Sequence, residues 1–191
     1  MTTESFNSAW RAMSRIEQSS VKQANAFIQM HYLKKRPAIV LLCLMMICNN
    51  EAVGCILYSA PPMQSDKRYK GKTWELSRLY LLDRIPCNAE TWLISQSIRH
   101  IKRHHPDVHH LVSYADPSAG HQGTIYKAAN WRPDGRTDDD RKTARCDYVD
   151  LRTGKKYGRA GNVPKTAEVQ KVPRISKHRF HYPIYQRTQQ P

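Results

Sequence analysis

One long helix flanked by two strands constrains the fold of this chain more than any other feature. Residues 88–104 carry apolar side chains at helical spacing, with Asn88 as the expected N-cap and basic residues at the far end. The apolar runs 74–83 and 111–115 on either side are typical of strands. A strand, a helix and a second strand normally form a right-handed crossover between parallel strands. The sequence therefore predicts an α/β or α+β fold with a mixed central β-sheet flanked by helices.

The remaining segments fit a single domain over residues 1–191. A turn at Asn49-Asn50 joins two apolar runs, which predicts a β-hairpin of residues 38–48 and 52–59. A helix is expected over residues 19–33, with Ser19 or Ser20 as its N-cap. We further expect an N-terminal segment 1–18, a loop at 61–72, a turn-rich segment at 132–136, a hairpin of residues 144–151 and 155–159, and a basic C-terminal extension 160–191 that could add a strand at 175–185.

The chain has a strong positive charge, with 31 Lys and Arg against 16 Asp and Glu and a formal net charge of +15. Such a chain is attracted to polyanions, and nucleic acid is the leading candidate. Charge that serves only solubility is the alternative. Toward the C-terminus, basic and aromatic residues alternate, as they do where charge meets phosphate and rings stack on bases. The candidate DNA contacts are Lys34, Lys35, Arg36, Arg174, Lys177 and Arg179, although the first three also suit a solvated helix end.

Cysteine usage and hydropathy indicate a reducing compartment. The five cysteines form no C-x-x-C pair and lie mostly in apolar runs, which favours free buried thiols over a zinc site. The first residues are polar and lack the features of a signal peptide. The most apolar stretch, residues 38–48, is shorter than the ~20 residues of a membrane helix. We expect a cytoplasmic protein without membrane contact.

Residues 111–131 contain the candidate site. Asp116 directly follows the predicted strand, and Pro117 favours an extended conformation for it. Gly120 and Gly123 then allow a tight path into a short helix that carries Tyr126. Ligands of open α/β sheets bind outside the carboxyl ends of strands. The pattern therefore favours a binding site, although an Asp-Pro pair often only caps a turn.

Arg78 lies within the strand predicted over residues 74–83. Strict alternation places it on one face with Leu76, Tyr80 and Leu82. A buried arginine needs a partner, and Asp116 or an anionic group of a ligand could be that partner. The alternative is an arginine that extends from the strand edge into solvent.

The order of predicted elements is similar to that of the GNAT acyltransferase superfamily. The local match is Ile125-Tyr126-Lys127-Ala-Ala-Asn130-Trp131, which resembles the superfamily pattern Leu-Tyr-x-x-x-Gly-Phe. This resemblance implies that Tyr126 is the general acid that protonates a leaving thiolate. Glycine is absent from residues 83–89, where the superfamily has its glycine-rich pyrophosphate loop. Without glycines the backbone cannot approach a pyrophosphate as closely, which argues against acetyl-CoA as the donor.

A narrower resemblance accounts for both the missing loop and the charge. Roughly residues 20–185 look like the Mom family of phage DNA-modification proteins, which convert the N6 amine of adenine to a carbamoylmethyl or acetamido-type adduct and protect phage DNA from restriction. The motifs are His31-Tyr32, Glu75-Leu-Ser-Arg78-Leu, Tyr114-Ala-Asp116-Pro, Gly120-His-x-Gly123-Thr-Ile-Tyr126 and Asn130-Trp131. The resemblance implies catalytic roles for Arg78, Asp116, Tyr126, His31 and Tyr32, and an infected bacterial cell as the location. Iron has been proposed for the family, and His31 would be its candidate ligand.

The resulting hypothesis is a base-flipping enzyme. An adenine must leave the duplex stack, and Tyr32, Tyr58 or Tyr114 would sandwich it. Asp116, aimed by Arg78, would accept the N6 proton or hold that amine, and Tyr126 would donate to the leaving group or stabilise developing charge. His31 would be a second base or a metal ligand. The further candidate substrate-binding residues are Ser77, Tyr80, Ser113, Gly120, His121 and Gly123.

The implied partners are double-stranded DNA and an acyl or glycyl-type group donor, either a small molecule or carrier-bound. Two other functions remain open from the sequence. One is an acyltransferase that acts on RNA, a protein amine or a small molecule. The other is a non-catalytic basic nucleic-acid-binding protein, in which Asp116 and Arg78 form a structural ion pair. Salt-sensitive DNA binding without any modified base would favour the latter.

Overall fold

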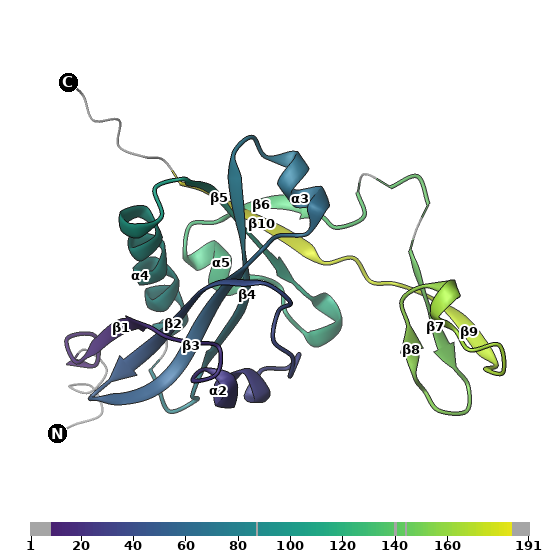
Figure 1. The fold of residues 1–191 in the computed structure, drawn as a ribbon, viewed down its shortest axis with the longest axis horizontal. Coiled ribbons are helices and arrows are strands. Elements are labelled where there is room, and N and C mark those ends of the chain that lie inside the picture. The colour runs from purple at the N-terminus through teal and green to yellow at the C-terminus, as the bar shows by residue number, and fades with distance from the viewer. Residues whose placement is uncertain (1–8, 87, 140, 144, 185–191) are drawn as a thin grey trace.

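The computed structural model describes residues 9–184 except 87, 140 and 144, and it has the expected α+β architecture (Figure 1). Its main sheet has seven strands in the order β1-β2-β3-β4-β5-β10-β6. The strands are β1 Ser14–Gln18, β2 Val40–Cys48, β3 Glu51–Ser59, β4 Lys72–Leu81, β5 Val108–Ala115, β6 Arg132–Arg136 and β10 His178–Pro183. The helices are α2 Asn25–Met30, α3 Met63–Arg68, α4 Ala89–His104 and α5 Thr124–Ala128. Within the described residues, no helix has both the length and the apolar character needed to cross a membrane.

The β2–β3 hairpin confirms the hairpin predicted over residues 38–48 and 52–59. It lies between two hydrophobic cores. Asn49 and Asn50 both have positive φ, 50° and 63°, as a tight two-residue hairpin turn requires. Side chains alternate across the strands, so one face packs on the long helix α4 and the other on α2. The described cysteines, Cys43, Cys48, Cys55 and Cys146, are free thiols, and the first three are buried.

The start of the first helix differs from the prediction, whereas the start of the long helix is confirmed with Asn88 in the N-cap position. The first helix, α2, begins only at Asn25, because Ser20 and Gln23 hydrogen-bond to each other's backbone N–H and side chain and close a turn before it. The long helix α4 matches the prediction closely, but Asn88 precedes it with a φ of 72° and makes no side-chain cap.

Strands β4 and β5 are parallel, as expected, but they pair over only part of their length. The pairing joins Lys72–Glu75 to Val108–Val112. Beyond Glu75, β4 continues beside β3, while β5 continues beside β10. The two central strands therefore diverge and leave an opening in the middle of the sheet.

A β-bulge lies at this point of divergence. Leu57 pairs with Arg78 and Tyr58 with Leu76, so Ser77 is an extra residue in β4. The strict alternation expected for this strand is therefore wrong. Leu76 packs in the core that faces α4, whereas Tyr80 packs against the α2 core.

The C-terminal part of the chain is built into the two sheets of the molecule. Residues expected as a basic extension form β10, which is inserted between β5 and β6, and β9 Val169–Pro173. The segment 132–136, expected as a turn, is the strand β6, because it pairs with β10. The segment 61–72, expected as a loop, contains the short helix α3. At the other end, β1 pairs with β2, so residues 14–18 of the expected N-terminal segment belong to the main sheet.

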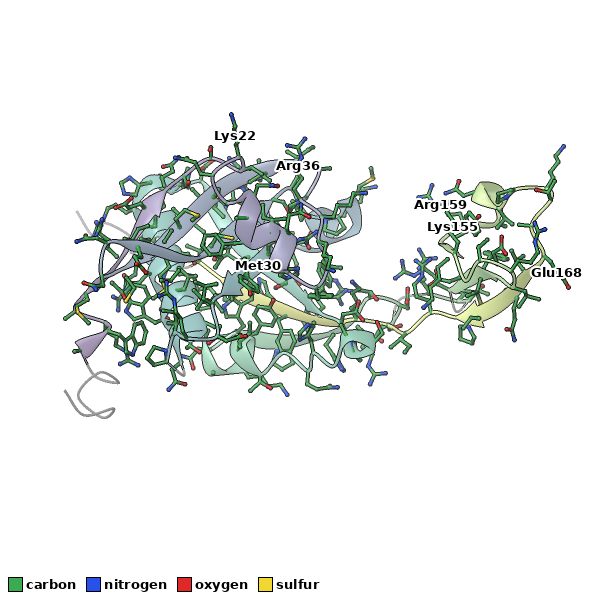
Figure 2. All side chains as sticks on the ribbon, turned by 90° about the horizontal axis from the view of Figure 1, so that it is seen from below. Lys22, Met30, Arg36, Lys155, Arg159 and Glu168 are labelled. Atoms are coloured by element: carbon green, nitrogen blue, oxygen red, sulfur yellow. The ribbon has the colours of Figure 1, made fainter. Side chains whose placement is uncertain are left out.

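A second sheet projects from the body of the molecule (Figures 1 and 2). It has three strands in the order β8-β7-β9, and its antiparallel pair β7 Cys146–Asp150 and β8 Lys156–Tyr157 is the predicted hairpin. We call residues 141–174, which contain this sheet, the basic arm. The chain leaves the main sheet after β6 and returns to it as β10, so the arm is an insertion between two neighbouring strands.

Candidate active site

A cavity of about 440 Å³ lies where β4 and β5 diverge. It is lined by β4, the end of β5, the segment after α2 and the turn before α5. It brings together most of the residues predicted from the sequence to form the site. These are His31, Tyr32, Ser77, Arg78, Tyr80, Tyr114, Gly120, His121, Gly123, Tyr126 and Lys177.

Glu75 also lines this cavity, although its sequence pattern indicated no role for it. Burial raises the pKa of Glu75 to about 7, against the opposing effects of Arg78 and Lys177. A carboxyl group with a pKa near neutrality can both accept and release a proton at physiological pH. The signal in the sequence was an acid in an otherwise apolar strand, three residues before an arginine.

Arg78 and Asp116 do not form the expected ion pair. The guanidinium of Arg78 donates to the backbone carbonyls of Lys35, at 2.9 Å, and Ser77, at 2.5 Å. Asp116 instead pairs with Lys177, at 2.9 Å. Because the β-bulge turns Arg78 toward the segment after α2, its guanidinium fixes that segment beside the cavity.

Asp116 lies just outside the cavity and caps the turn that follows β5. Its carboxylate accepts hydrogen bonds from the backbone N–H and the hydroxyl of Ser118. Partial burial alone would raise the pKa of Asp116, but the bonds from Ser118 and Lys177 lower it below its usual value. An ion-paired carboxylate with a lowered pKa is a weaker proton acceptor than Glu75.

Three aromatic rings form one wall of the cavity. The ring centroids of His31 and Tyr32 lie 4.5 Å apart, and those of Tyr32 and His121 lie 4.7 Å apart. Burial, with Arg78 and His121 nearby, lowers the pKa of His31 to about 4, so this ring is neutral at physiological pH. The backbone N–H of Leu33 donates to Nδ1 of His31, at 3.2 Å, which leaves the proton on Nε2. In this tautomer, the ring of His31, which lines the cavity, carries its one N–H donor on Nε2.

Tyr126 reaches the cavity from α5 and is held rigidly. It packs against Trp131 and Phe180 and forms a hydrogen bond with Ser113, which itself donates to the carbonyl of Leu76. Burial raises the pKa of Tyr126 to about 12, so its hydroxyl stays protonated. Ser113 therefore lies behind Tyr126 as its support and is not part of the cavity lining.

Tyr58, expected to contact a base, lies in the core. It is fully buried, and its hydroxyl is 2.7 Å from that of Ser97 on α4. The bulge in β4 shifts the pairing with β3 at this point, and Tyr58 faces α4 together with Leu76. It therefore has no access to the cavity.

A second, larger cavity of about 890 Å³ adjoins the first and separates the body from the basic arm. We call it the basic cleft, because its lining contains Lys67, Arg68, Arg141, Arg145, Lys156, Arg174, Lys177 and Arg179. Both spaces share three lining residues, Glu75, Tyr114 and Lys177. The basic cleft and the first cavity therefore meet at these side chains.

The candidate DNA contacts occupy different environments. Lys34, Lys35 and Arg36 are exposed on the segment that Arg78 fixes beside the cavity. Arg174 pairs with Asp147 at the base of the arm. Arg179 is buried and donates to the carboxylate and the carbonyl of Asp134, which places it in the framework below the cleft.

The diverging strands and the cavity between them define a GNAT-like acyltransferase fold. An acetyltransferase of this class from Elizabethkingia anophelis, solved with acetyl-CoA bound, matches with a TM-score of 0.55 and 11% identity over 90% of this chain and 99% of its own. A Bacillus subtilis acetyltransferase, solved with CoA, matches with a TM-score of 0.55 and 13% identity over the same shares.

With this fold, the chain belongs to the Mom protein family, whose model matches residues 13–191. A relative is the methylcarbamoylase Mom of Escherichia phage Mu, which is 37% identical over 57 residues. That match covers 30% of this chain and only 24% of the phage Mu protein.

The connection between β4 and α4 does not fit the pyrophosphate of coenzyme A. It contains no glycine, and Pro86 supplies no N–H. The N–H of Ala89 already donates to the carbonyl of Pro86, at 3.3 Å. Asp83 and Glu90 add negative charge where a pyrophosphate would need positive charge. Among its described residues, the connection therefore lacks the glycine-rich backbone that would let a pyrophosphate approach closely, and its basic side chain, Arg84, is paired with Glu51.

The described side chains around His31 do not support an iron site. In the described part of the chain, no group of three or more His, Cys, Asp or Glu residues is placed to hold a metal ion. The Nδ1 atom of His31 is already an acceptor for the N–H of Leu33. The expectation of His31 as an iron ligand is thus not met.

Proposed function

We propose that this protein modifies the N6 amine of adenine in DNA with a carbamoylmethyl-type group. The observation that carries the proposal is the position of Glu75, a proton acceptor tuned to neutral pH at the junction of an aromatic-walled cavity and a basic cleft. Membership of the Mom family and the relative from phage Mu support this choice of substrate. Protection of phage DNA from restriction would be the biological outcome.

The two spaces suit the two parts of a flipped-base substrate. A duplex in the basic cleft would be held through its phosphates. One adenine would leave the stack and enter the cavity, where the ring of Tyr32 stacks on it. The 440 Å³ of the cavity is within the usual range for small-molecule sites and leaves room for the group to be transferred.

The chemistry is a substitution at a methylene carbon of the donor. The N6 lone pair is conjugated with the purine ring, so the amine becomes a good nucleophile only as its proton departs. Glu75 accepts that proton while the N6–C bond forms and the bond from carbon to the leaving group breaks. The hydroxyl of Tyr126 turns its proton from Ser113 to the leaving group and donates it there, and the Nε2–H of His31 orients the amide of the donor. The donor is a small molecule or carrier with such an activated methylene group, and no step passes through coenzyme A.

The rate of modification is expected to depend on pH through Glu75. Its carboxylate must be ionised to accept the proton, so the rate falls about tenfold per pH unit below the pKa of about 7 and levels off above it. The assay incubates purified protein and duplex DNA with a bacterial extract as the donor source and measures initial rates from pH 5.5 to 8.5. A rate that is constant over this range would exclude Glu75 as the proton acceptor.

Tyr32 is expected to act through its ring and not its hydroxyl. Replacement by Ala removes a stacking surface and should reduce modification by about 10- to 100-fold, because base stacking contributes about 1–3 kcal/mol. Replacement by Phe keeps the ring and should retain most of the activity. The same extract assay compares the two variants, and equal losses in both would contradict a stacking role.

The experiment that tests the function examines DNA from bacteria that express the protein. Plasmid DNA is digested to nucleosides and analysed by mass spectrometry against DNA from cells with an empty vector. We expect an adenine nucleoside in which a carbamoylmethyl group replaces one N6 hydrogen. Salt-sensitive DNA binding without any heavier adenine nucleoside would instead support a non-catalytic DNA-binding protein.

A further inference from the structure

The basic arm carries charge well beyond the needs of its own folding. Residues 141–174 contain ten Lys and Arg against three Asp and Glu. Its exposed cations include Lys155, Lys156 and Arg159 at and after the β7–β8 hairpin turn. Figure 2 shows Lys155 and Arg159 on the side of the arm toward the body and Glu168 on the opposite side. Lys156 lines the basic cleft itself. These three cations thus lie toward the space between arm and body.

The arm is not held together by an apolar core. Among the described residues, every buried apolar side chain lies outside 141–174. Polar contacts hold it instead: the carboxylate of Asp150 accepts from the N–H groups of Arg152 and Thr153 at the hairpin turn, and Asp147 pairs with Arg174 at the base. A sheet of this kind contributes little to the stability of the body. Its exposed cations are available to an external anionic partner.

The position of the arm beside the cavity indicates which kind of partner it binds. The basic cleft between arm and body adjoins the first cavity, and the two share Glu75, Tyr114 and Lys177 in their linings. A polyanion in the cleft would therefore lie against both the arm and the mouth of the cavity. Duplex DNA combines a regular array of phosphates with bases that can be extruded sideways.

We propose that the arm is a DNA clamp, which holds the phosphate backbone of the duplex against the body while one adenine enters the cavity. This inference rests on the proposed function and adds a surface to it. The contacts are to phosphates, so they position the duplex and carry no sequence information. The arm takes no part in the chemical step.

The test removes three charges from the arm and three from elsewhere. One variant combines Lys155→Ala, Lys156→Ala and Arg159→Ala. The control combines Lys22→Ala, Arg99→Ala and Arg103→Ala, which are exposed residues of the body that line neither cavity. Both have the same net charge. Fluorescence anisotropy with a labelled DNA duplex of about 25 base pairs gives Kd at several salt concentrations, and circular dichroism confirms that each variant is folded.

We expect the arm variant to bind the duplex at least about tenfold more weakly at about 0.1 M salt. Its slope of log Kd against log salt should fall by about two to three, since each phosphate contact contributes about 0.9. The control should keep nearly the wild-type slope. Equal losses in both variants, or wild-type binding by the arm variant, would overturn the clamp. If the wild type modifies adenine and the arm variant binds normally, only the clamp fails. If the wild type itself neither binds the duplex nor modifies adenine, the proposed function fails with it.

Discussion

Replacement of Glu75 by Gln is expected to reduce adenine modification by about 10²- to 10⁴-fold, the usual contribution of a general base. The amide is nearly the same size and keeps the lining of the cavity, but it cannot accept the N6 proton. Duplex binding should not weaken, because the substitution keeps the lining of the cleft and removes none of its cations. Nucleoside mass spectrometry of DNA from expressing cells measures the loss, and anisotropy measures the binding.

The same substitution should stabilise the fold at alkaline pH. Burial raises the pKa of Glu75 from its usual 4.5 to about 7 in the folded protein, so the wild type loses stability as the pH rises from 4.5 through 7. A glutamine at this position has no charge at any of these pH values, so the variant does not lose stability in this way. The free energy of unfolding at pH 8 should therefore rise by about 2–3 kcal/mol, with little change at pH 4.5.

Urea unfolding of both proteins at the two pH values measures this difference, with Glu168→Gln on the exposed face of the arm as the control. A variant that is both inactive and more stable is the signature of a site residue kept at a cost in stability. An equal change in stability at both pH values would show that the burial of Glu75 does not affect its ionisation.

Replacement of Gly123 by Ala is expected to destabilise the protein by about 2–4 kcal/mol. Gly123 has a φ of 76°, and an added Cβ would lie 2.2 Å from ring atoms of Phe180 on β10. The left-handed backbone costs a residue with a side chain about 1–2 kcal/mol, and the overlap forces the ring to move. The ring of Phe180 packs against Tyr126, so the shift also disturbs the cavity.

Gly120 provides the matched control for this second prediction. It has nearly the same φ, 78°, but no atom lies within 4 Å of an added Cβ. Gly120→Ala should therefore show only the backbone cost of about 1–2 kcal/mol. In thermal unfolding, Gly123→Ala should lower Tm by about 5–15 °C, and Gly120→Ala by clearly less. Equal shifts in Tm would mean that the contact with Phe180 is unimportant.

The helices and strands that were predicted correctly have a strong pattern in their own local sequence. The β2–β3 hairpin combines two apolar runs with an Asn-Asn turn, and α4 combines helical spacing with prolines at both ends. The strand β6 had no such signal, because its residues Arg132–Arg136 suggest a turn and only pairing with β10 makes them a strand. Local composition could not reveal that pairing.

The candidate site was found in outline for the same reason. The motifs around Arg78, Asp116 and Tyr126 lie within or directly after predicted elements, and the structure places them around one opening in the sheet. The partners of each side chain could not be predicted. The bulge at Ser77 turns Arg78 away from Asp116, and Lys177 arrives from a distant segment to pair with that carboxylate. The role of Glu75 depends on its burial, which only the fold creates.

The most direct measurement is a crystal structure of the Glu75→Gln variant bound to a DNA duplex, since this variant should bind its substrate without modifying it. We predict one adenine outside the stack, in the cavity between β4 and β5, with its ring on Tyr32 and N6 about 3 Å from the side chain at position 75. A duplex bound with every base stacked, or an adenine extruded into any other part of the molecule, would contradict the account.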